Sequence, residues 1–339
     1  MTGPKLISIV LPTFNRAAFL PEAFASIAAQ NYHEWELVIV DDGSTDPTPA
    51  VLDRLVPDCP RPVRVVRQAN QGAYAARNTG LDHASGDAVA FFDSDDLWLP
   101  HHLERCAHAL ATHSEVDWVF GACRMVEMAS GRELEPSTFY VKGQPRPFLS
   151  LRAHADGDLR VIDDQRATAM QIEHGLYCGL QNSVIRRSVF QSRRFWPDYF
   201  VVEDELFVIR LLASGGRFAY LDDPHVVYRV HGDNSSGAAV GNDTARNTRI
   251  FSELVRGLER IGREVPLSRG ARNALARRLA HERFWSLGYS GFWQGGDAVS
   301  ARACYRQSLG EWPWSPAMWK TFVASFVKRA PNPAAKTVN

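Results

Sequence analysis

The fold is decided by the stretch Ala88-Val89-Ala90-Phe91-Phe92-Asp93-Ser94-Asp95-Asp96, in which an apolar run passes directly into carboxylates. Five apolar residues bounded by polar ones predict a buried strand of a parallel sheet. Asp93 and Asp95 lie two positions apart just past the end of that strand, so both can face one divalent ion. Hard cations such as Mg²⁺ and Mn²⁺ prefer oxygen ligands and often share them with substrate phosphates. A D-x-D triplet is common by chance, and its position after a buried strand gives it weight here.

Strand and helix patterns alternate through the first third of the chain. Apolar runs predict further strands at 7–11, 36–40 and 63–67, and helical spacing predicts helices at 17–30, 46–56 and 72–84. Strands that alternate with helices imply right-handed crossovers and a mostly parallel sheet. The predicted fold class is therefore α/β.

Polar segments follow all four predicted strands. They are Pro12-Thr13-Phe14-Asn15-Arg16, Asp41-Asp42, Asn70-Gln71-Gly72 and Asp93-Ser94-Asp95-Asp96. In open parallel sheets, ligands bind at the carboxyl ends of the strands. Turns are often polar, so one such segment says little, but four at the same edge of one sheet indicate a binding site.

The pattern is less regular beyond residue 124. Residues 125–175 hold glycine, proline and an acidic patch, and they are expected to be loops. A firmer pattern returns at 184–187, followed by a predicted helix at 203–214 and a predicted strand at 217–221. Residues 232–244 predict a loop or linker, 245–330 read as helical, and 331–339 are expected to be a disordered tail.

Length and composition set outer bounds on the protein class. The 339 residues suffice for about two domains and a large buried core. Hydrophobic residues make up 45% and charged residues 22%, which excludes a disordered chain, a collagen-like chain and a disulfide-stapled miniprotein. The net charge is zero, yet the residues from 245 onward include 16 basic and 6 acidic ones. An acidic N-terminal part therefore precedes a basic C-terminal part.

Five cysteines stand at positions 59, 106, 123, 178 and 304. None forms a C-x-x-C pair and their number is odd, so free thiols in a reducing compartment are expected rather than a zinc site or disulfides. Histidines such as His101 and His102 show no ligand spacing. The first apolar run is too short for a signal peptide, and no run approaches the ~18 apolar residues of a spanning helix. A cytoplasmic protein is expected, peripheral at the inner face of a membrane if it contacts one.

Four ordered blocks carry a resemblance to a known family. They are IVLPTFNR at 9–16, VIVDDGSTD at 38–46, NQGAYAARNTG at 70–80 and FDSDDLW at 92–98. Together they resemble the family 2 inverting glycosyltransferases, which have the nucleotide-sugar-binding fold called GT-A. The match covers about 1–230. It implies a GT-A domain over 1–231, with a nucleotide-sugar half (1–124) and an acceptor and catalytic-base half (125–231), followed by a smaller all-helical domain over 245–330.

The resemblance places a group of residues around a nucleotide-sugar donor. Those expected to contact its base, ribose or sugar are Pro12, Thr13, Asn15, Arg16, Asp42, Asn70, Ser94, Trp98 and Glu203. Asp42 would accept the imide N–H of uracil, with a turn-forming aspartate as the alternative. Trp98 is as consistent with a core position as with the wall of a sugar or acceptor pocket.

The same resemblance implies that a set of charged residues binds the phosphates and a metal ion, Mn²⁺ or Mg²⁺. Arg77 matches an arginine that reaches toward the diphosphate, and a place on a helix surface is the alternative. Asp93 is expected to face the ribose and the metal, and Asp95 to bind the metal directly. His231 is a candidate third ligand, although it could be a loop histidine without that role. Asp96 would shape the site or cap the next helix.

The helix predicted at 203–214 begins with acids, which helix capping alone would explain. The resemblance makes Asp204 the general base, in the family's Glu-Asp pair. It would take the proton of an acceptor hydroxyl that attacks the anomeric carbon in line, so that one displacement gives inversion. The metal would neutralise charge on the leaving diphosphate. The chain departs from the family at Val201-Val202, where a glycine is common, and 125–175 matches no pattern.

The tail mixes aromatic, apolar and basic residues, from Trp312-Pro313-Trp314 through Trp319 and Phe326 to Lys328 and Arg329. This composition suits a helix packed on its own domain, and it also suits a helix lying on an anionic membrane surface. No nucleic-acid motif is present, so nucleic acid is not expected as a partner.

The sequence therefore predicts a metal-dependent inverting glycosyltransferase. The expected donor is a UDP-sugar, and the expected acceptor is a hydroxyl of a glycan, a lipid-linked molecule or a protein. A nucleotidyltransferase should carry a Gly- and Arg-rich loop after the first strand, and a dinucleotide-binding oxidoreductase should carry G-x-G-x-x-G; neither is present. A non-enzymatic scaffold on a decayed transferase domain is the remaining alternative, against which the retained Asp93, Asp95 and Asp204 argue.

Overall fold

The computed structural model describes residues 3–232 and 243–331, which form two compact units. One unit holds the chain up to Ala167 together with Gly175–Gly232. The other holds Thr168–His174 together with the described residues from 243 onward. Most of the predicted linker, 233–242, and nearly all of the predicted tail, 332–339, lie outside the described residues.

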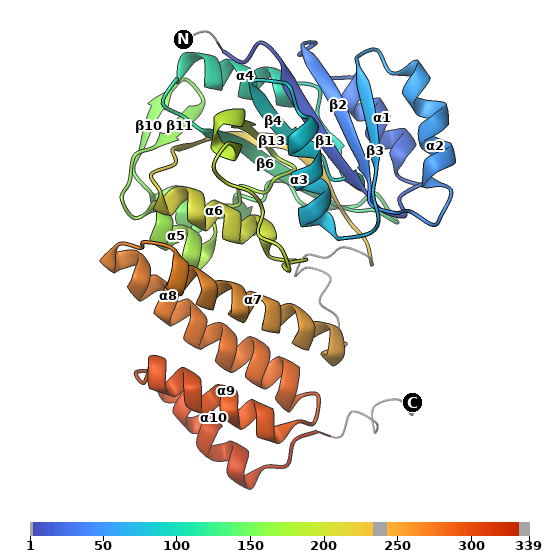
Figure 1. Cartoon of the computed structure of the whole chain (residues 1–339). Coiled ribbons are helices and arrows are strands. Elements are labelled where there is room, and N and C mark those ends of the chain that lie inside the picture. Colours follow the sequence, from blue (N-terminus) through green and yellow to red (C-terminus); the bar gives the residue numbers. More distant parts are fainter. Residues whose placement is uncertain (1–2, 233–242, 332–339) are drawn as a thin grey trace. The chain divides into compact units, whose positions relative to one another are not determined.

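The first unit is built on a mixed sheet with the strand order β10-β11-β13-β6-β12-β4-β1-β2-β3 (Figure 1). Its parallel part consists of β1 (Ile7–Thr13), β2 (Trp35–Asp41), β3 (Val63–Arg67) and β4 (Ala88–Phe91). These four strands were predicted at nearly the same bounds. The antiparallel β12 (Ser183–Arg186) lies between β4 and β6 (Trp118–Glu127), and β6 pairs in parallel with β13 (Phe218–Val230). The expected α/β class is confirmed, but the sheet is mixed: the pairings among β1 to β4 and the β6–β13 pairing are parallel, and the remaining pairings are antiparallel.

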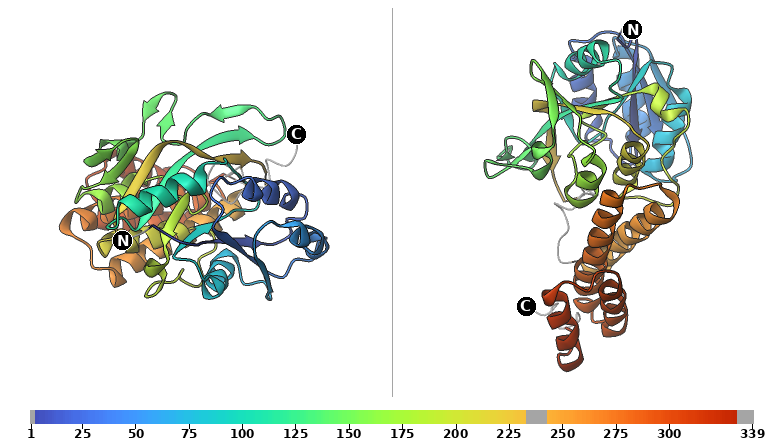
Figure 2. Two further views of the ribbon diagram at one scale, coloured as in Figure 1. Left: turned by 90° about the horizontal axis from the view of Figure 1, so that it is seen from above. Right: turned by 90° about the vertical axis from the view of Figure 1, so that its left-hand side faces the viewer.

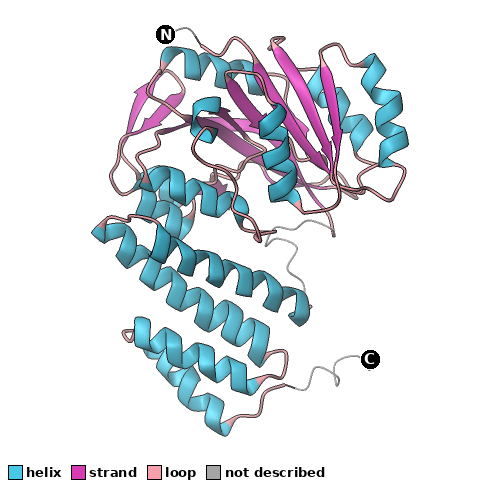
Figure 3. Cartoon of the chain, in the orientation of Figure 1, coloured by secondary structure: helices cyan, strands magenta, loops and turns pink. Residues whose placement is uncertain are grey.

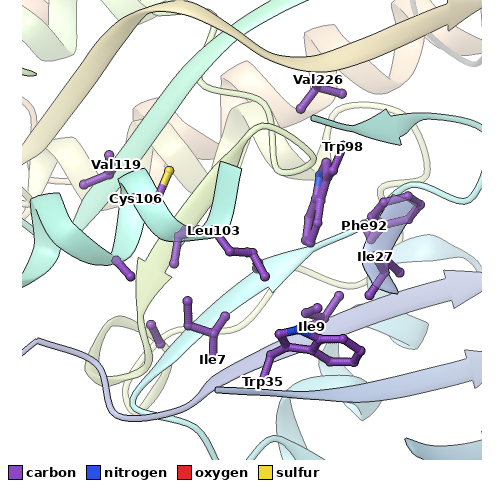
Figure 4. Close-up of a cluster of buried hydrophobic side chains, with 14 of the residues drawn as sticks. Ile7, Ile9, Ile27, Trp35, Phe92, Trp98, Leu103, Cys106, Val119 and Val226 are labelled. Carbon is purple, nitrogen blue, oxygen red and sulfur yellow. The ribbon is translucent and has the colours of Figure 1, made fainter. Parts of the chain in front are cut away.

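Helices cover both faces of this sheet because alternate strand residues point to opposite faces (Figures 1 and 2). The helices packed on one face are α1 (Leu20–Ala28), α2 (Thr48–Leu55, followed by η1, Val56–Asp58) and α4 (His102–Thr112). They bury Ile7 and Ile9 of β1 in one apolar cluster (Figure 4). On the other face α3 (Ala73–His83) approaches so closely that a Cβ at Gly80 would lie 2.3 Å from a methyl carbon of Val10.

The loops predicted for 125–175 are only partly confirmed, because short strands and helices interrupt them. The elements in this region are β7 (Glu133–Glu135), β8 (Tyr140–Val141), β9 (Gln144–Pro145), η2 (Pro147–Ser150), β10 (Ala153–Asp156), β11 (Leu159–Ile162) and α5 (Ala167–His174). Most of the strands are very short and partly exposed, so they lack the apolar runs that mark β1 or β4.

Strand β13 is longer than the strand predicted at 217–221. It continues to Val230 through register shifts on either side of Pro224, so the sheet pairing survives a residue that usually ends a strand. The short β5 (Leu97–Trp98) pairs with it. The helix α6 (Glu203–Ala213) follows η3 (Arg187–Phe190), close to the bounds predicted for it.

In the described residues of the second unit, all regular secondary structure is helical (Figure 3). Besides α5 it contains α7 (Thr244–Glu264), α8 (Arg269–His281), the π-type helix η5 (Glu282–Trp293), α9 (Ala298–Glu311) and α10 (Pro316–Val327). Side chains that accept amide hydrogens at the helix starts are Asp243, Ser268, Asp297 and Ser315. Phe284 stacks on Tyr305 in its core. None of the described helices is both long and apolar enough to cross a bilayer.

Candidate functional site

The loops that follow β1 and β2 are joined by hydrogen bonds at the carboxyl edge of the sheet. The Thr13 carbonyl accepts the Asp42 amide at 2.9 Å. The Asn15 side-chain oxygen accepts the Thr45 amide at 2.8 Å and the Asp46 amide at 3.2 Å. Asn15 has a φ of +53°, a conformation that asparagine tolerates better than most residues. The first two polar segments therefore lie together, as the parallel topology predicts.

Asp42 holds the third polar segment. Its carboxylate accepts the backbone amides of Gln71 at 2.9 Å and Gly72 at 2.7 Å, and the Gln68 side chain at 2.7 Å. Asp42 is buried, and these three bonds fill most of the roughly four acceptor positions of a carboxylate. The structure thus gives Asp42 a role in positioning the loop that carries the exposed Asn70.

The fourth segment brings Asp95 against two cationic or ionisable groups. Its Oδ2 lies 3.2 Å from Nε2 of His231 and 3.7 Å from Nη2 of Arg16. His231 is 136 residues away in sequence and reaches Asp95 because β13 ends here. Pro12 lies at the end of β1 and is half-buried, and Ser94 is buried between the two aspartates.

Asp96 and Arg229 fix the position of this acidic segment. The buried Asp96 carboxylate accepts the Arg229 amide at 3.0 Å, while the Arg229 side chain donates to the Asp95 carbonyl and pairs with Glu22 of α1. Because α4 begins at His102, Asp96 does not cap it. Asp96 instead ties the acidic segment to β13 through Arg229. Arg229 stands in the run Tyr228-Arg229-Val230-His231, two residues before the candidate metal ligand, and this proximity was the one sequence signal for the contact.

Arg77 lies between two carboxylates. Its Nη2 is 3.1 Å from Oδ1 of Asp93, and its Nη1 is paired with Glu203. The side chains of Arg77 and Glu203 are 9% and 7% exposed, which excludes a position on the helix surface. Burial raises the pKa of Asp93 and raises the pKa of Glu203 to about 7, while the charge of Arg77 opposes both shifts. Asp204, the next residue, contributes negative charge to the same cluster.

These contacts divide the predicted ligands into two groups. Asp95 and His231 are adjacent, but Asp93 turns to Arg77, and the three do not close into one cluster of ligand atoms among the described residues. An imidazole and a carboxylate oxygen fit Mn²⁺ or Mg²⁺ when substrate oxygens complete the coordination shell.

Trp98 is buried in the core, which favours the core alternative over the wall of a sugar or acceptor pocket. It is 3% exposed and belongs to the apolar cluster under α1 and α4 (Figure 4). Its ring packs on Phe92 and His102, and its indole N–H donates to the Gln181 carbonyl at 2.7 Å. The sequence could not distinguish the two positions because both favour an aromatic residue after an apolar strand.

The family model described as glycosyl transferase family 2 matches residues 8–191. An uncharacterised glycosyltransferase from a Nostoc species is 28% identical over 282 residues, which cover 82% of this chain and 81% of the relative. A PGL/p-HBAD biosynthesis glycosyltransferase of Mycobacterium tuberculosis is 38% identical over 122 residues, 36% of this chain and 47% of that enzyme. This chain therefore aligns with less than half of the mycobacterial protein.

Two solved structures resemble most of the chain. TarS of Staphylococcus aureus in complex with UDP-GlcNAc has a TM-score of 0.60 and 19% identity, covering 92% of this chain and 81% of that one. A mannosyltransferase from Pyrobaculum calidifontis with GDP-Man and Mn²⁺ has a TM-score of 0.55 and 21% identity, covering 96% and 86%. At this identity the likeness concerns the fold, and the expected GT-A fold with a helical extension is confirmed.

Proposed function

Because the chain belongs to glycosyl transferase family 2 and is therefore a glycosyltransferase, we propose that it uses a divalent metal ion and inverts the anomeric centre of a UDP-sugar. The observation that carries this proposal is the meeting, at one sheet edge, of Asp95 with His231 and of Arg77 with Asp93 and Glu203. Asp95 and His231 would supply the metal ligands. Arg77, Asp93 and Glu203 would support the neighbouring Asp204, the proposed general base.

Asp95 and His231 would hold the Mn²⁺ or Mg²⁺ ion. When bound, the ion supplies charge neutralisation to the leaving diphosphate. Arg16 lies on the same edge, and its planar cation is suited to a phosphate oxygen. Asp93, which is 31% exposed beside Arg77, is available to the ribose. Because both terminal nitrogens of Arg77 are engaged by carboxylates, we assign it the positioning of Asp93 and Glu203 and leave the phosphates to Arg16.

Asp204 is the proposed general base. It lies in the first turn of α6, and its Oδ1 accepts the Glu205 amide at 2.7 Å, which orients the carboxylate. The neighbouring Glu203 is anchored by Arg77, so the start of α6 is tied to the segment that carries Asp93. The acceptor hydroxyl would lose its proton to Asp204 as it attacks the anomeric carbon, and a single displacement gives inversion.

The donor assignment is tested by calorimetric titration of UDP, GDP, dTDP and CDP, each with and without Mn²⁺. We expect UDP to bind with a strong dependence on Mn²⁺. In Asp95→Ala that dependence should be lost, and the affinity for UDP in the presence of Mn²⁺ should be at least about tenfold weaker. Loss of a residue that only supports a metal ligand already weakens metal binding about 10–100-fold, and loss of the ligand itself should weaken it at least as much. Asp53→Ala, which removes a 74% exposed carboxylate, is the matched control and should bind as wild type does.

Either of two results would contradict the donor assignment. Unchanged metal dependence in Asp95→Ala would remove this residue from the metal site. Absence of binding by all four nucleotides in a folded sample would favour the non-enzymatic scaffold. The proposed acceptor is a hydroxyl of a glycan, a lipid-linked molecule or a protein. Curated relatives are named for PGL/p-HBAD biosynthesis and for teichuronic acid biosynthesis, which are statements about those proteins.

The helix α10 supports a second part of the proposal, contact with an anionic membrane surface. Exposed apolar side chains of this segment are Trp314, Trp319, Val323, Phe326 and Val327. Lys320, Lys328 and Arg329 accompany them, and the sequence has no acidic residue after Glu311. Met318 and Ser325 of the same helix are buried, so one face packs within the unit while another is left to a partner. Aromatic and basic residues together suit an interface with anionic lipid.

We expect the full chain to co-sediment with phosphatidylserine-containing vesicles and to do so weakly with phosphatidylcholine alone. The double substitution Trp319→Ser/Val323→Ser should abolish the co-sedimentation, because it removes apolar area from the exposed face of α10. Val299→Ser is the matched control, since Val299 of α9 is 78% exposed in the same unit. Equal sedimentation of the double variant and the control would contradict the membrane proposal.

A further inference from the structure

Three side chains with nitrogen or sulfur ligand atoms meet inside the first unit, away from the sheet edge. His102 and Cys106 lie one turn apart on α4, and His225 projects from β13. The two Nδ1 atoms of the histidines are 3.1 Å apart, and the Cys106 sulfur is 3.9 Å from each. All three residues are 0% exposed, and Figure 4 shows the sulfur among the apolar side chains of the core.

We propose that His102, Cys106 and His225 form a zinc site. Zinc bonds of about 2.0–2.1 Å to nitrogen and about 2.3 Å to sulfur at tetrahedral angles place two nitrogens roughly 3.3 Å apart and nitrogen and sulfur roughly 3.6 Å apart. The observed triangle of 3.1, 3.9 and 3.9 Å differs from this by a few tenths of an ångström. Thiolate and imidazole ligands select zinc over the oxygen-preferring ion proposed for Asp95.

The surroundings of His225 favour a ligand role. A Cβ at Gly121 of β6 would lie 2.3 Å from the His225 ring, so the strand omits a side chain where the imidazole lies. The Nε2 of His225 is 3.5 Å from Oδ1 of Asp223, and Asp223 is itself paired with Arg105. A carboxylate behind a histidine fixes which ring nitrogen carries the proton and leaves the other lone pair for a metal.

Without a metal ion the cluster is poorly compensated. One Nδ1–H can donate to the other Nδ1, but in the part of the chain that the structure describes Nε2 of His102 has no hydrogen-bond partner and Nε2 of His225 has only the 3.5 Å approach to Asp223. Burying two imidazoles in a hydrophobic cluster carries a desolvation penalty that apolar residues at the same positions would not carry. A bound cation offsets that penalty. All five cysteines are free of disulfides, as expected, and the proposal would make Cys106 a zinc ligand.

A neighbouring group of possible ligands fits a metal less well. His101, Asp223 and His225 also approach one another. The Nε2 of His101, however, lies 3.1 Å from the Pro224 carbonyl, an acceptor that requires a hydrogen on that nitrogen. This nitrogen then has no lone pair to give, so Asp223 acts as the carboxylate behind His225 and not as a ligand.

Zinc binding at this site would have a defined proton balance and a structural consequence. The Cys106 thiol gives its proton to solvent, while the histidines bind through Nδ1 and keep their protons on Nε2. The site would join α4 to β13, the strand whose end carries Arg229 and His231 to Asp95. The zinc ion would thereby help to hold β13, and with it Arg229 and His231, in position next to Asp95.

The test uses the full chain, stripped with a chelator and titrated with Co²⁺ as a spectroscopic substitute for zinc. We expect a thiolate-to-cobalt charge-transfer band that saturates at one equivalent, and one equivalent of zinc by elemental analysis after zinc is restored. The band should disappear in Cys106→Ser and in His225→Gln. It should persist in Cys123→Ser, which removes another buried thiol, and in Asp95→Ala, because the proposed donor site contains no cysteine.

A measurement on the unmodified chain protects the test against variants that fail to fold. One equivalent of Zn²⁺ should raise the midpoint of thermal unfolding, because an ion that binds only the folded chain stabilises it. Absence of the band in the wild-type chain, or its survival in folded Cys106→Ser, would overturn the proposal. Loss of the band in folded Asp95→Ala would also overturn the proposal, because that variant keeps all three proposed ligands.

Discussion

Asp204→Asn is expected to lose sugar transfer while keeping nucleotide binding. Asparagine has nearly the same shape as aspartate, but it cannot take the proton of the acceptor hydroxyl. General-base catalysis is worth about 10²–10⁴-fold, so kcat should fall by that factor. The affinity for UDP with Mn²⁺ should not change, because the proposed metal ligands Asp95 and His231 remain in place. Transfer kinetics and calorimetry on the same preparation measure both quantities.

Glu205→Gln is the matched control for this prediction, since Glu205 is a carboxylate in the same first turn of α6. It should retain most of the activity. If Asp204→Asn turns over at the wild-type rate, Asp204 is not the base. If both variants lose kcat equally, the acids at the start of α6 act through their negative charge near the helix N-terminus, and neither serves as a general base.

Arg77→Met is expected to give the largest loss of stability. The substitution leaves the buried Glu203 carboxylate without its counter-ion and removes a partner of Asp93. Removing one member of a buried ion pair lowers the free energy of unfolding by about 3 kcal/mol or more, because the remaining charge stays desolvated. Urea unfolding followed by circular dichroism measures the change.

Two further variants isolate the cause. Arg67→Met removes a pair with Asp53 in which the side chains are 55% and 74% exposed, and it should lower the free energy of unfolding by less than about 1 kcal/mol. Arg77→Met/Glu203→Met should recover much of the loss, since apolar side chains often replace a buried ion pair well. A double variant no more stable than Arg77→Met would indicate that lost packing, and not the unpaired charge, causes the effect.

The parallel half of the sheet was predictable because its strands are uninterrupted apolar runs. Residues 7–11 and 88–92 can be recognised as buried strands from the sequence alone. Because these strands alternate with helices, they are expected to be parallel and to have their carboxyl ends at one edge of the sheet. The meeting of Asp95 with His231 across 136 residues was not visible in spacing. It came from the family resemblance, which supplies long-range proximity that a single chain does not display.

Other features depend on three-dimensional packing and left no local signal. Asp42 could serve a nucleotide base or a loop with equal chemistry, and only the positions of the Gln71 and Gly72 amides reveal the second role. Arg77 and Glu203 are 126 residues apart, so the patterns of the helices α3 and α6 give no sign that the two residues pair. The cluster of Cys106 with two histidines escaped notice because its third member lies on a distant strand.

The segment Thr168–His174 has a consequence for how such a protein can be assembled from parts. It belongs to the helical unit, where Glu173 pairs with Arg277 and the Ile172 carbonyl accepts from Arg278 at 2.7 Å. Yet it lies inside the region matched by the family model. The helical unit is therefore not a cassette that recombination can attach at a single junction. A chimera that inherits α8 from one parent must inherit α5 from the same parent, so the two segments should be exchanged together.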